Sequence, residues 1–449
     1  MTNEKSINRR CSAKRMIRQT VFPFKMERTG ESLTAHGGLA LLAEYNHGMG
    51  LRELADRHLP GPGSNRGYAP STFVDSLTLM LQAGGRRLED LRELRREGPL
   101  LSLMGRKEIP DADTLGDWLR RIGDPKNDQV GLSGLGLVRD TLTHRLLRRE
   151  RADHTLDVDA TPVEGEKQEA SYTYQGVKGY MPLLGFLFES GVCLLDEFRE
   201  GNESPGSNQL SFYRRCKERM PNGQRIARYR ADSASYQAAL INELEADQVR
   251  WTITADQDQA VKESIKGIPE EAWKEPLPGC GYEIAETVHT MNQTHYAFRL
   301  VVKRELRRQG NLFAGGAYFH HAVATNWGEE KSAFEVLLWH NQRGQAENFH
   351  KELKGGFGQD QMPCGQSFAN AVYFRIGVIA YNLFIGFKRL ACPSWAHHTI
   401  ATFRWKLIQI AGRIVRHAGQ ILLKLAIGPE TLILLQGIRQ QCYQESLVT

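Results

Sequence analysis

Alternating strand-like and helix-like patterns between residues 154 and 255 constrain the fold of this chain more than any other feature. The stretch HTLDVDATPV at 154–163 alternates and is β-branched, which predicts a strand. An antiparallel meander of three strands is expected to lead into two strand–helix crossover units. This order predicts the α/β class with a mixed sheet. The expected strands span 154–163, 180–188, 191–200, 224–232 and 249–255, and the expected helices span 207–220 and 235–246.

The segments on either side of this alternation have other patterns. Residues 36–150 read as helices broken by Gly and Pro, which suits a helix-turn-helix module and a plain helical bundle alike. Strand-like stretches between 256 and 330 predict a β-rich insertion, after which the pattern returns to helix. We therefore expect five parts, with the α/β domain divided by the insertion and helical regions at both ends. They span 1–150, 151–255, 256–330, 331–390 and 391–449.

Positive charge gathers at the two ends of the chain. The net charge is +6, but residues 1–30 hold eight Lys and Arg against Glu4 and Glu27, and residues 388–440 hold eight against Glu430 alone. Two basic ends around a more acidic middle favour a protein that lies along nucleic acid. For either end taken singly, a solvated basic tail is the commoner explanation.

Cysteine usage and hydropathy indicate a cytoplasmic protein. The seven cysteines are scattered without a CxxC pair or zinc-type spacing, which predicts reduced thiols. The basic N-terminus lacks the apolar core of a secretory signal. The most apolar stretch, 371–390, is interrupted by Arg375 and Asn382, so we expect a buried helix there and no membrane partner.

One expected helix face carries a combination of acidic and basic residues that suggests a chemical function. In HNQRGQAENFHKELK (340–354), Arg343, Glu347, His350 and Lys354 follow one another at i, i+4, i+7 and i+11. At about 100° per residue, these offsets keep all four within about 40° of one direction. The plain interpretation is a solvated helix with intrahelical ion pairs. The sharper one is a carboxylate that binds a cation, flanked by bases that hold an anion, as at a metal ion on a phosphodiester.

Such a site needs further carboxylates, and the expected strands supply them. Asp157 and Asp159 point to the same face of their strand, because side chains alternate with period two. Asp232 stands at the carboxyl end of its strand, where open α/β sheets place ligands. Each could also be a surface or capping residue, and Asp232 could cap the helix that begins near residue 235.

Together these residues resemble the DDE transposases of bacterial insertion sequences. The chain has DAT at 159–161, ADSASY at 231–236, a β-rich insertion and a late Glu helix. One large branch of that family carries the signature Tyr, two residues, Arg, three residues, Glu, six residues, Lys. Arg343, Glu347 and Lys354 match its spacing, while His340 occupies the Tyr position. HGGLALLAEY near the start and GRIVRHAG near the end are similar to one subgroup.

The resemblance implies an RNase H-like catalytic domain with two Mg²⁺ (or Mn²⁺) ions held by Asp159, Asp232 and Glu347. Asp157 stays an alternative to Asp159. Arg343 and Lys354 would neutralise phosphates beside the scissile bond, with His350, Lys351 and His340 as weaker candidates for DNA contact.

The implied activity is transposition. The protein would cleave double-stranded DNA at the terminal inverted repeats of its insertion sequence and join the 3′-hydroxyl ends to target DNA. It would act as a homodimer in the bacterial cytoplasm, at the nucleoid, and the helical region 1–150 would bind DNA. Two rival hypotheses are a metal-dependent nuclease of the same fold and a non-catalytic DNA-binding protein, such as a decayed transposase.

Overall fold

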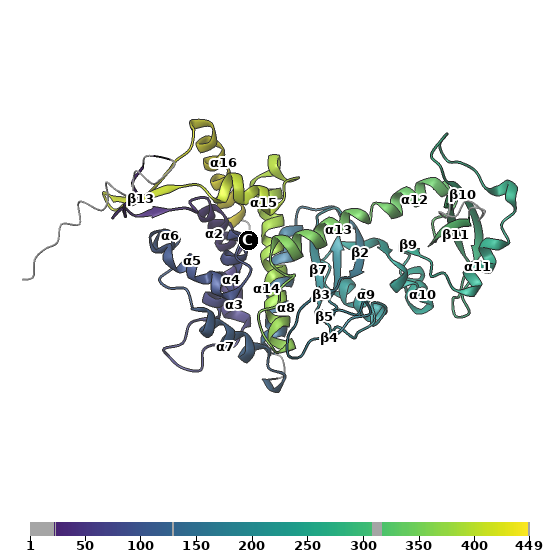
Figure 1. Cartoon of the computed structure of the whole chain (residues 1–449), viewed down its shortest axis with the longest axis horizontal. Helices are drawn as coiled ribbons and strands as arrows, with labels where there is room; N and C mark the ends of the chain where they lie inside the picture. Colours follow the sequence, from purple (N-terminus) through teal and green to yellow (C-terminus); the bar gives the residue numbers. More distant parts are fainter. Residues whose placement is uncertain (1–21, 23, 128–129, 308–316, 448–449) are drawn as a thin grey trace, which may run out of the picture.

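The computed structural model describes residue 22 and residues 24–127, 130–307 and 317–447. Most of the basic residues of the N-terminal tail lie outside the described residues, and so does Cys11. The molecule is elongated: helices from both ends of the sequence form one end, and a large sheet extends from the middle to the other end (Figure 1).

The large sheet has eight strands in the order β10-β11-β12-β9-β8-β2-β6-β7. β2 pairs in parallel with β8, and β8 in parallel with β9, while the other neighbours are antiparallel. The expected α/β class with a mixed sheet is confirmed. The strands are β2 (Asp153–Ala160), β6 (Leu183–Leu187), β7 (Val192–Glu197), β8 (Arg225–Ala231), β9 (Arg250–Thr254), β10 (Glu283–His289), β11 (Phe298–Arg307) and β12 (Ala317–Thr325).

Two helices make the crossovers that the parallel pairs require. α9 (Gln209–Glu218) leads from β7 towards β8, and α10 (Ala238–Ala246) connects β8 to β9. The predicted meander is present as well, because β2, β6 and β7 pair antiparallel in sequence order. All five strands and both helices expected between residues 154 and 255 are therefore found.

The strands of the expected insertion join this sheet. β12 pairs antiparallel with β9 over three residue pairs, and β11 and β10 continue the sheet outward. α12 (Ala333–Asn341) lies on this extension, where Val336 and Leu337 pack with Ile284, Val301 and Val323 in a small separate core. α11 (Gln259–Lys266) packs beside β10.

The helical end of the molecule draws on both ends of the sequence. α14 is buried along nearly its whole length and packs against α4, α7, α8 and β7, while α16 packs against α2. These helices are α2 (Leu39–Gly48), α3 (Leu51–His58), α4 (Pro70–Ala83), α5 (Leu91–Arg96), α6 (Gly98–Leu103), α7 (Ala112–Gly123), α8 (Val130–Leu147), α14 (Ser367–Gly386) and α16 (Pro429–Ser446). Residues on both sides of the expected boundaries at 150 and 390 therefore share one core.

The apolar stretch that was expected to be a buried helix forms α14. Residues Ser367–Ala391 are long and apolar enough to cross a membrane by length and composition, and 89% of their most apolar window is buried inside the protein. The segment is thus the central core helix of the helical end.

The expectation of a wholly helical C-terminal region is wrong for residues 412–425. β13 (Gly412–His417) and β14 (Gln420–Leu425) form a hairpin, and β13 also pairs with the short β1 (Leu33–Thr34). Its two turn residues, Ala418 and Gly419, have φ of 49° and 75°. Positive φ at both central positions matches the twist of the flanking strands. Short helices, among them α15 (Ile400–Phe403), precede the hairpin.

Candidate active site

Two aspartates stand side by side at the carboxyl ends of neighbouring parallel strands. In the β2–β8 register, Asp157 lies opposite Arg230 and Val158 opposite Ala231. Asp159 follows Val158 and Asp232 follows Ala231, so the two come next in that register. The carboxyl edge of a parallel pair is where open α/β sheets bind ligands. The sequence-based placement of Asp232 at the end of its strand is confirmed.

Asp157 is occupied by a structural partner. Arg230 Nε donates to its Oδ1 at 2.7 Å and Nη2 to its Oδ2 at 2.8 Å. Both side chains are buried, and the guanidinium lies against the rings of Phe188 and Trp339, 4.2 and 4.9 Å from their centroids. The two carboxylate oxygens of Asp157 are therefore both used inside the protein.

The charged stretch 340–354 is not one regular helix, which corrects the sequence-based interpretation. α12 ends at Asn341, α13 (Gly344–Lys351) begins three residues later, and a π-helical turn follows at Glu352–Gly356. The Arg343 amide donates to the His340 carbonyl, and the Ala346 amide donates to the Arg343 carbonyl. These bonds between residues three apart tighten the junction. Gly344 lowers helix propensity at this point.

A cavity of about 420 Å³ opens beside Asp159. Glu347 and His350 come from α13, and Lys354 comes from the π-helical turn. Asp232 does not line the cavity; its Oδ1 accepts a hydrogen bond from the Ala234 amide at 3.0 Å, which caps the short turn Ser233–Ser235. The lining residues are Asp159, Thr161, Glu347, His350, Lys351, Lys354, Gly355 and Asp360.

The electrostatics of Asp159 reflect crowding by other carboxylates. Its pKa is raised to about 7, first because the carboxyl is desolvated and then because Asp232 and Glu347 add negative charge, while Arg343 opposes the shift. Like charges at one site disfavour ionisation, so these three carboxylates share one electrostatic environment. Glu347 itself is exposed on the first turn of α13.

His350 is buried against Asp159 without a hydrogen bond. Its Nε2 lies 3.9 Å from Asp159 Oδ2, and among the described residues neither ring nitrogen has a hydrogen-bond partner. Burial, with Lys354 and Arg343 nearby, lowers the pKa of His350 to about 3. The imidazole is therefore neutral at neutral pH and brings a lone pair to the cavity rather than a positive charge.

Lys354 joins the π-helical turn to the loop after β2. Its Nζ donates to the Pro162 carbonyl at 2.6 Å and lies 3.3 Å from Thr161 Oγ1. Partial burial lowers its pKa, and the carboxylates of Asp360, Glu164 and Asp159 oppose that shift. The ammonium group is held at the mouth of the cavity.

His340 lies away from the cavity. Its Nδ1 is 2.9 Å from Thr252 Oγ1 and its Nε2 is 3.0 Å from Thr254 Oγ1, and only 3% of the residue is exposed. Burial and the neighbouring Arg343, His321 and Arg230 lower its pKa to about 3. In this structure, His340 connects α12 to β9 and has no surface for DNA.

Comparison with known families identifies the chain. The family model described as "Transposase DDE domain group 1" matches residues 20–438. The chain belongs to this family. A solved structure with a related chain path is the cryo-EM structure of the piggyBac transposase synaptic complex with hairpin DNA, at 10% identity and a TM-score of 0.47. That match covers 83% of this chain and 79% of the other. No curated protein matches the sequence.

The carboxylates of this DDE transposase fit a divalent cation by their chemistry. Across the residues that the structure describes, no three His, Cys, Asp or Glu side chains lie close enough together to hold a metal ion as they stand. The pKa of Asp159 is raised by desolvation and by the negative charge of Asp232 and Glu347, and a divalent cation would relieve the repulsion among these carboxylates. An all-oxygen donor set suits Mg²⁺ or Mn²⁺.

The transposase cavity also contains residues that sequence reasoning missed. Asp360 adds a further acid, and Thr161 receives Lys354. Thr161 belongs to the DAT motif, so the sequence did point to this residue. Asp360 lies in the loop GGFGQDQ, where nothing but proximity to Glu347 in sequence pointed to it.

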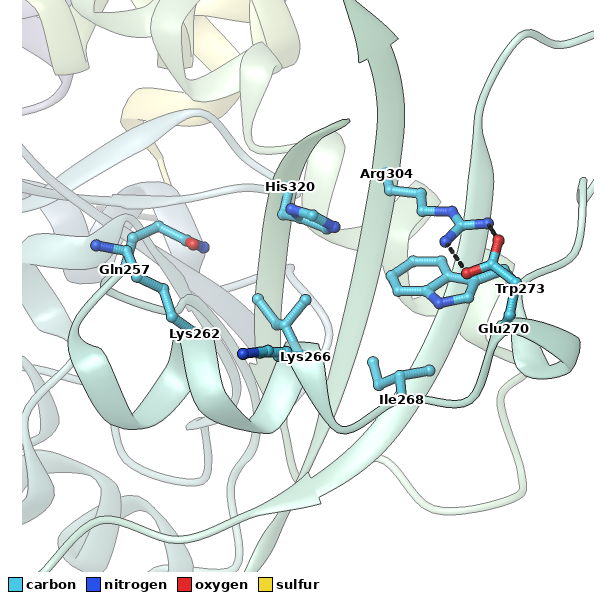
Figure 2. Close-up of a pocket in the computed structure, with 9 residues that line it drawn as sticks. Gln257, Lys262, Lys266, Ile268, Glu270, Trp273, Arg304 and His320 are labelled. Carbon is cyan, nitrogen blue, oxygen red and sulfur yellow. Dashed lines mark hydrogen bonds and ion pairs between the residues drawn. The ribbon is translucent and has the colours of Figure 1, made fainter. Parts of the chain in front are cut away.

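A second cavity, of about 370 Å³, lies on the sheet extension and does not offer the same chemistry (Figure 2). Glu270 is the only acid among the described residues that line it, and Arg304 Nη1 donates to Glu270 Oε2 at 2.8 Å. Figure 2 shows the guanidinium above the ring of Trp273, 4.3 Å from its centroid. Its carboxylate is already paired with Arg304, so the described residues of this cavity do not offer the group of carboxylates that gathers around Asp159.

Proposed function

We propose that this transposase cleaves DNA at the terminal inverted repeats of its insertion sequence and joins the freed 3′-hydroxyl ends to target DNA. Asp159, Asp232 and Glu347 would hold two divalent ions, Mg²⁺ or Mn²⁺. One observation carries the proposal: Asp159 and Asp232 stand at the carboxyl ends of adjacent parallel strands, and the charges of Asp232 and Glu347 both act on the carboxyl group of Asp159.

The topology supports an RNase H-like catalytic domain. The inner part of the sheet has the order β7-β6-β2-β8-β9, with β2, β8 and β9 parallel and β6 antiparallel to β2. The catalytic acids of this proposal come from the central strand β2, its neighbour β8 and the late helix α13. The β10–β12 extension stands between β9 and that helix in the sequence.

The protein groups around the carboxylates have separate tasks. When bound, the divalent ions supply Lewis-acid activation of water or a 3′-hydroxyl and stabilise the leaving oxygen. Arg343, Lys351 and Lys354 would place and neutralise the phosphates on either side of the scissile bond, because bases at this site can bind phosphate without competing for the cation. His350 would pack against Asp159 from the buried side.

The same proposal assigns Asp159, not Asp157, as the first catalytic carboxylate. What supports this choice is that Asp159 is partly exposed at the cavity, whereas Arg230 binds both oxygens of Asp157. We also propose that each of the two DNA ends is cut and joined at its own active site, in a homodimer that forms on the DNA.

The test uses purified protein, a plasmid that carries both terminal repeats of its element, and Mg²⁺ or EDTA. Products are sequenced for cut ends and for joined junctions. We expect metal-dependent junctions from the wild-type protein and none from Glu347→Gln. Glu271→Gln, which replaces an exposed glutamate at the far end of the sheet, serves as the matched control. This variant should form joined junctions at the wild-type level.

Other outcomes select a rival function. Cut ends without junctions would show a nuclease of the same fold. Binding to the repeats without cutting in either metal would show a DNA-binding protein that lacks catalysis. A Glu347→Gln variant that cuts at the wild-type rate would overturn the assignment of Glu347.

A further inference from the structure

A further cavity, of about 460 Å³, lies beside the candidate active site, towards the helical end of the molecule. Two chain segments line both cavities in turn. The loop after β2 contributes Thr161 to the first cavity and 164–167 to the second, and the loop after α13 contributes Asp360 to the first and 361–363 to the second. The two cavities therefore adjoin along the same two loops. We call the second of them, lined by 86–89, Glu164, Gly165, Lys167 and 361–363, the flank groove.

The third wall of the flank groove is a loop from the N-terminal helices that is fixed in place. The backbone amides of Arg86 and Arg87 donate to Asp90 Oδ2 at 2.7 and 3.0 Å. Arg86 Nη2 donates to the carbonyl of Gly355, and Tyr373 donates its hydroxyl to the Arg86 carbonyl at 3.3 Å. The loop thus has a defined position beside the π-helical turn that carries Lys354.

The loop approaches so closely that one wall position requires glycine. Gly358 has φ of +65°, and a Cβ there would lie 3.2 Å from the Cα of Arg86. A larger residue would be strained and would push the loop away from the groove. The close approach keeps the N-terminal helices and the catalytic part of the sheet in one rigid arrangement at this point.

The flank groove presents two unpaired cations. Within the described residues, neither Arg87 nor Lys167 forms an ion pair, although both line the groove. Arg86 is partly satisfied by Asp360, 3.9 Å away. The opposing acids are Glu89 and Glu164, and the charge of Glu164 acts on Lys354, whose pKa it supports. A polyanion that lies across both cavities would therefore have Lys354 beside it in the first and Arg87 and Lys167 beside it in the flank groove.

We propose that the flank groove binds the phosphate backbone of the DNA that adjoins the scissile phosphate, with Arg87 and Lys167 as its phosphate contacts. The proposal rests on the proposed function, since it takes the first cavity as the site of cleavage. Side chains of this kind fix the register of DNA without reading its sequence. Arg87 and Lys167 are positioning residues, because they hold the strand on one side of the cut and do not touch the reacting atoms.

The test measures DNA affinity by fluorescence anisotropy in Ca²⁺, at several salt concentrations, with the full-length protein. One labelled duplex carries the terminal repeat with DNA on both sides of the cut, and two others are trimmed at the cut on one side or the other. The variant is Arg87→Gln with Lys167→Gln, and Lys167→Gln alone serves if the double variant does not fold. Lys266→Gln with Lys274→Gln, which replaces two exposed lysines outside the groove and outside the basic ends of the chain, is the matched control.

We expect the double variant to reduce the slope of log affinity against log salt by about 2 on the full duplex, or about 1 for each lost phosphate contact. The control should keep the wild-type slope. On the duplex trimmed on the flank side, wild type and double variant should bind equally, because no DNA fills the groove.

The remaining outcomes separate the two proposals. Equal slopes for wild type and double variant on the full duplex would overturn the flank groove and leave the proposed function untouched. A reduced slope in the variant, together with a wild-type protein that never cuts DNA in Mg²⁺ or Mn²⁺, would sustain the groove and overturn the proposed function. A difference that persists on both trimmed duplexes would show a nonspecific charge effect and would also overturn the groove.

Discussion

Arg230 donates to both carboxylate oxygens of Asp157 while that carboxylate stands two residues before Asp159 on the same face of β2. One strand therefore carries a buried, fully paired acid and a crowded, cavity-lining acid in adjacent positions of the same face. The two aspartates should respond oppositely to neutralisation.

Asp157→Asn should destabilise the fold. Removing the charge leaves the guanidinium of Arg230 buried without a counter-ion, which costs about 3–5 kcal/mol when one partner of a buried pair is lost. Urea denaturation of the metal-free protein should show this decrease in the free energy of unfolding. Asp159→Asn should show no such loss. If Asp157→Asn unfolds at the wild-type midpoint, the pair does not stabilise the protein.

Divalent metal should stabilise the protein through the same carboxylates that we propose as catalytic. A ligand at a hundred times its dissociation constant stabilises the folded state by about 2.7 kcal/mol. Mg²⁺ or Mn²⁺ should therefore raise the melting temperature of the wild type and of Glu271→Gln, but not of Asp159→Asn or Glu347→Gln. An equal increase in all four proteins would place the metal elsewhere.

The metal-free protein should lose stability as the pH rises, because of Asp159. Its folded-state pKa is raised to about 7, whereas an unfolded Asp titrates near 3.9, so the unfolded state releases its proton first. The free energy of unfolding should fall between about pH 4 and pH 7, by at most about 4 kcal/mol from this group.

Asp159→Asn removes this contribution, while Asp157, whose pKa burial raises to about 6, continues to titrate in both proteins. The variant should match the wild type near pH 4 and become the more stable protein at pH 8 in EDTA, as measured by thermal unfolding across that range. A wild type that gains stability relative to Asp159→Asn over the same range would show that the carboxyl has an ordinary or lowered pKa.

His340→Ala should affect folding and leave DNA contact unchanged. The imidazole lies between the hydroxyls of Thr252 and Thr254, and its loss leaves both without that partner at a cost of about 1–3 kcal/mol. Chemical denaturation should detect the loss. The salt dependence of DNA binding by the folded fraction should equal that of the wild type; a slope reduced by about 1 would instead indicate a phosphate contact.

The regular part of the fold could be predicted because its signals are local. The strands and helices between residues 154 and 255 follow from alternation and periodicity, and Asp232 was expected where β8 ends. The stretch 340–354 was harder, since Gly344 interrupts a pattern whose periodicity continues across it. His340 and His350 lie in helices, as expected, but the sequence did not show that both side chains would be buried and neutral.

Other features depend on contacts distant in sequence. Residues 412–425 form a hairpin because Ala418 and Gly419 adopt positive φ and β1 pairs with β13, and neither fact can be read from hydropathy. The choice between Asp157 and Asp159 depends on Arg230, 73 residues away in the sequence. Asp360 lies at the cavity because of the path taken by the glycine-rich loop that carries it, and hydropathy does not predict that path.

The position of α14 also determines when the chain can fold. The apolar faces of α4, α7 and α8 close on a helix that begins at residue 367, and α2 closes on α16, near the end of the chain. A growing polypeptide therefore carries its N-terminal helices without their main partner until most of the sequence has been synthesised. Fragments that stop before α14 should expose this surface and aggregate, so the helical end cannot form until α14 and α16 have been synthesised.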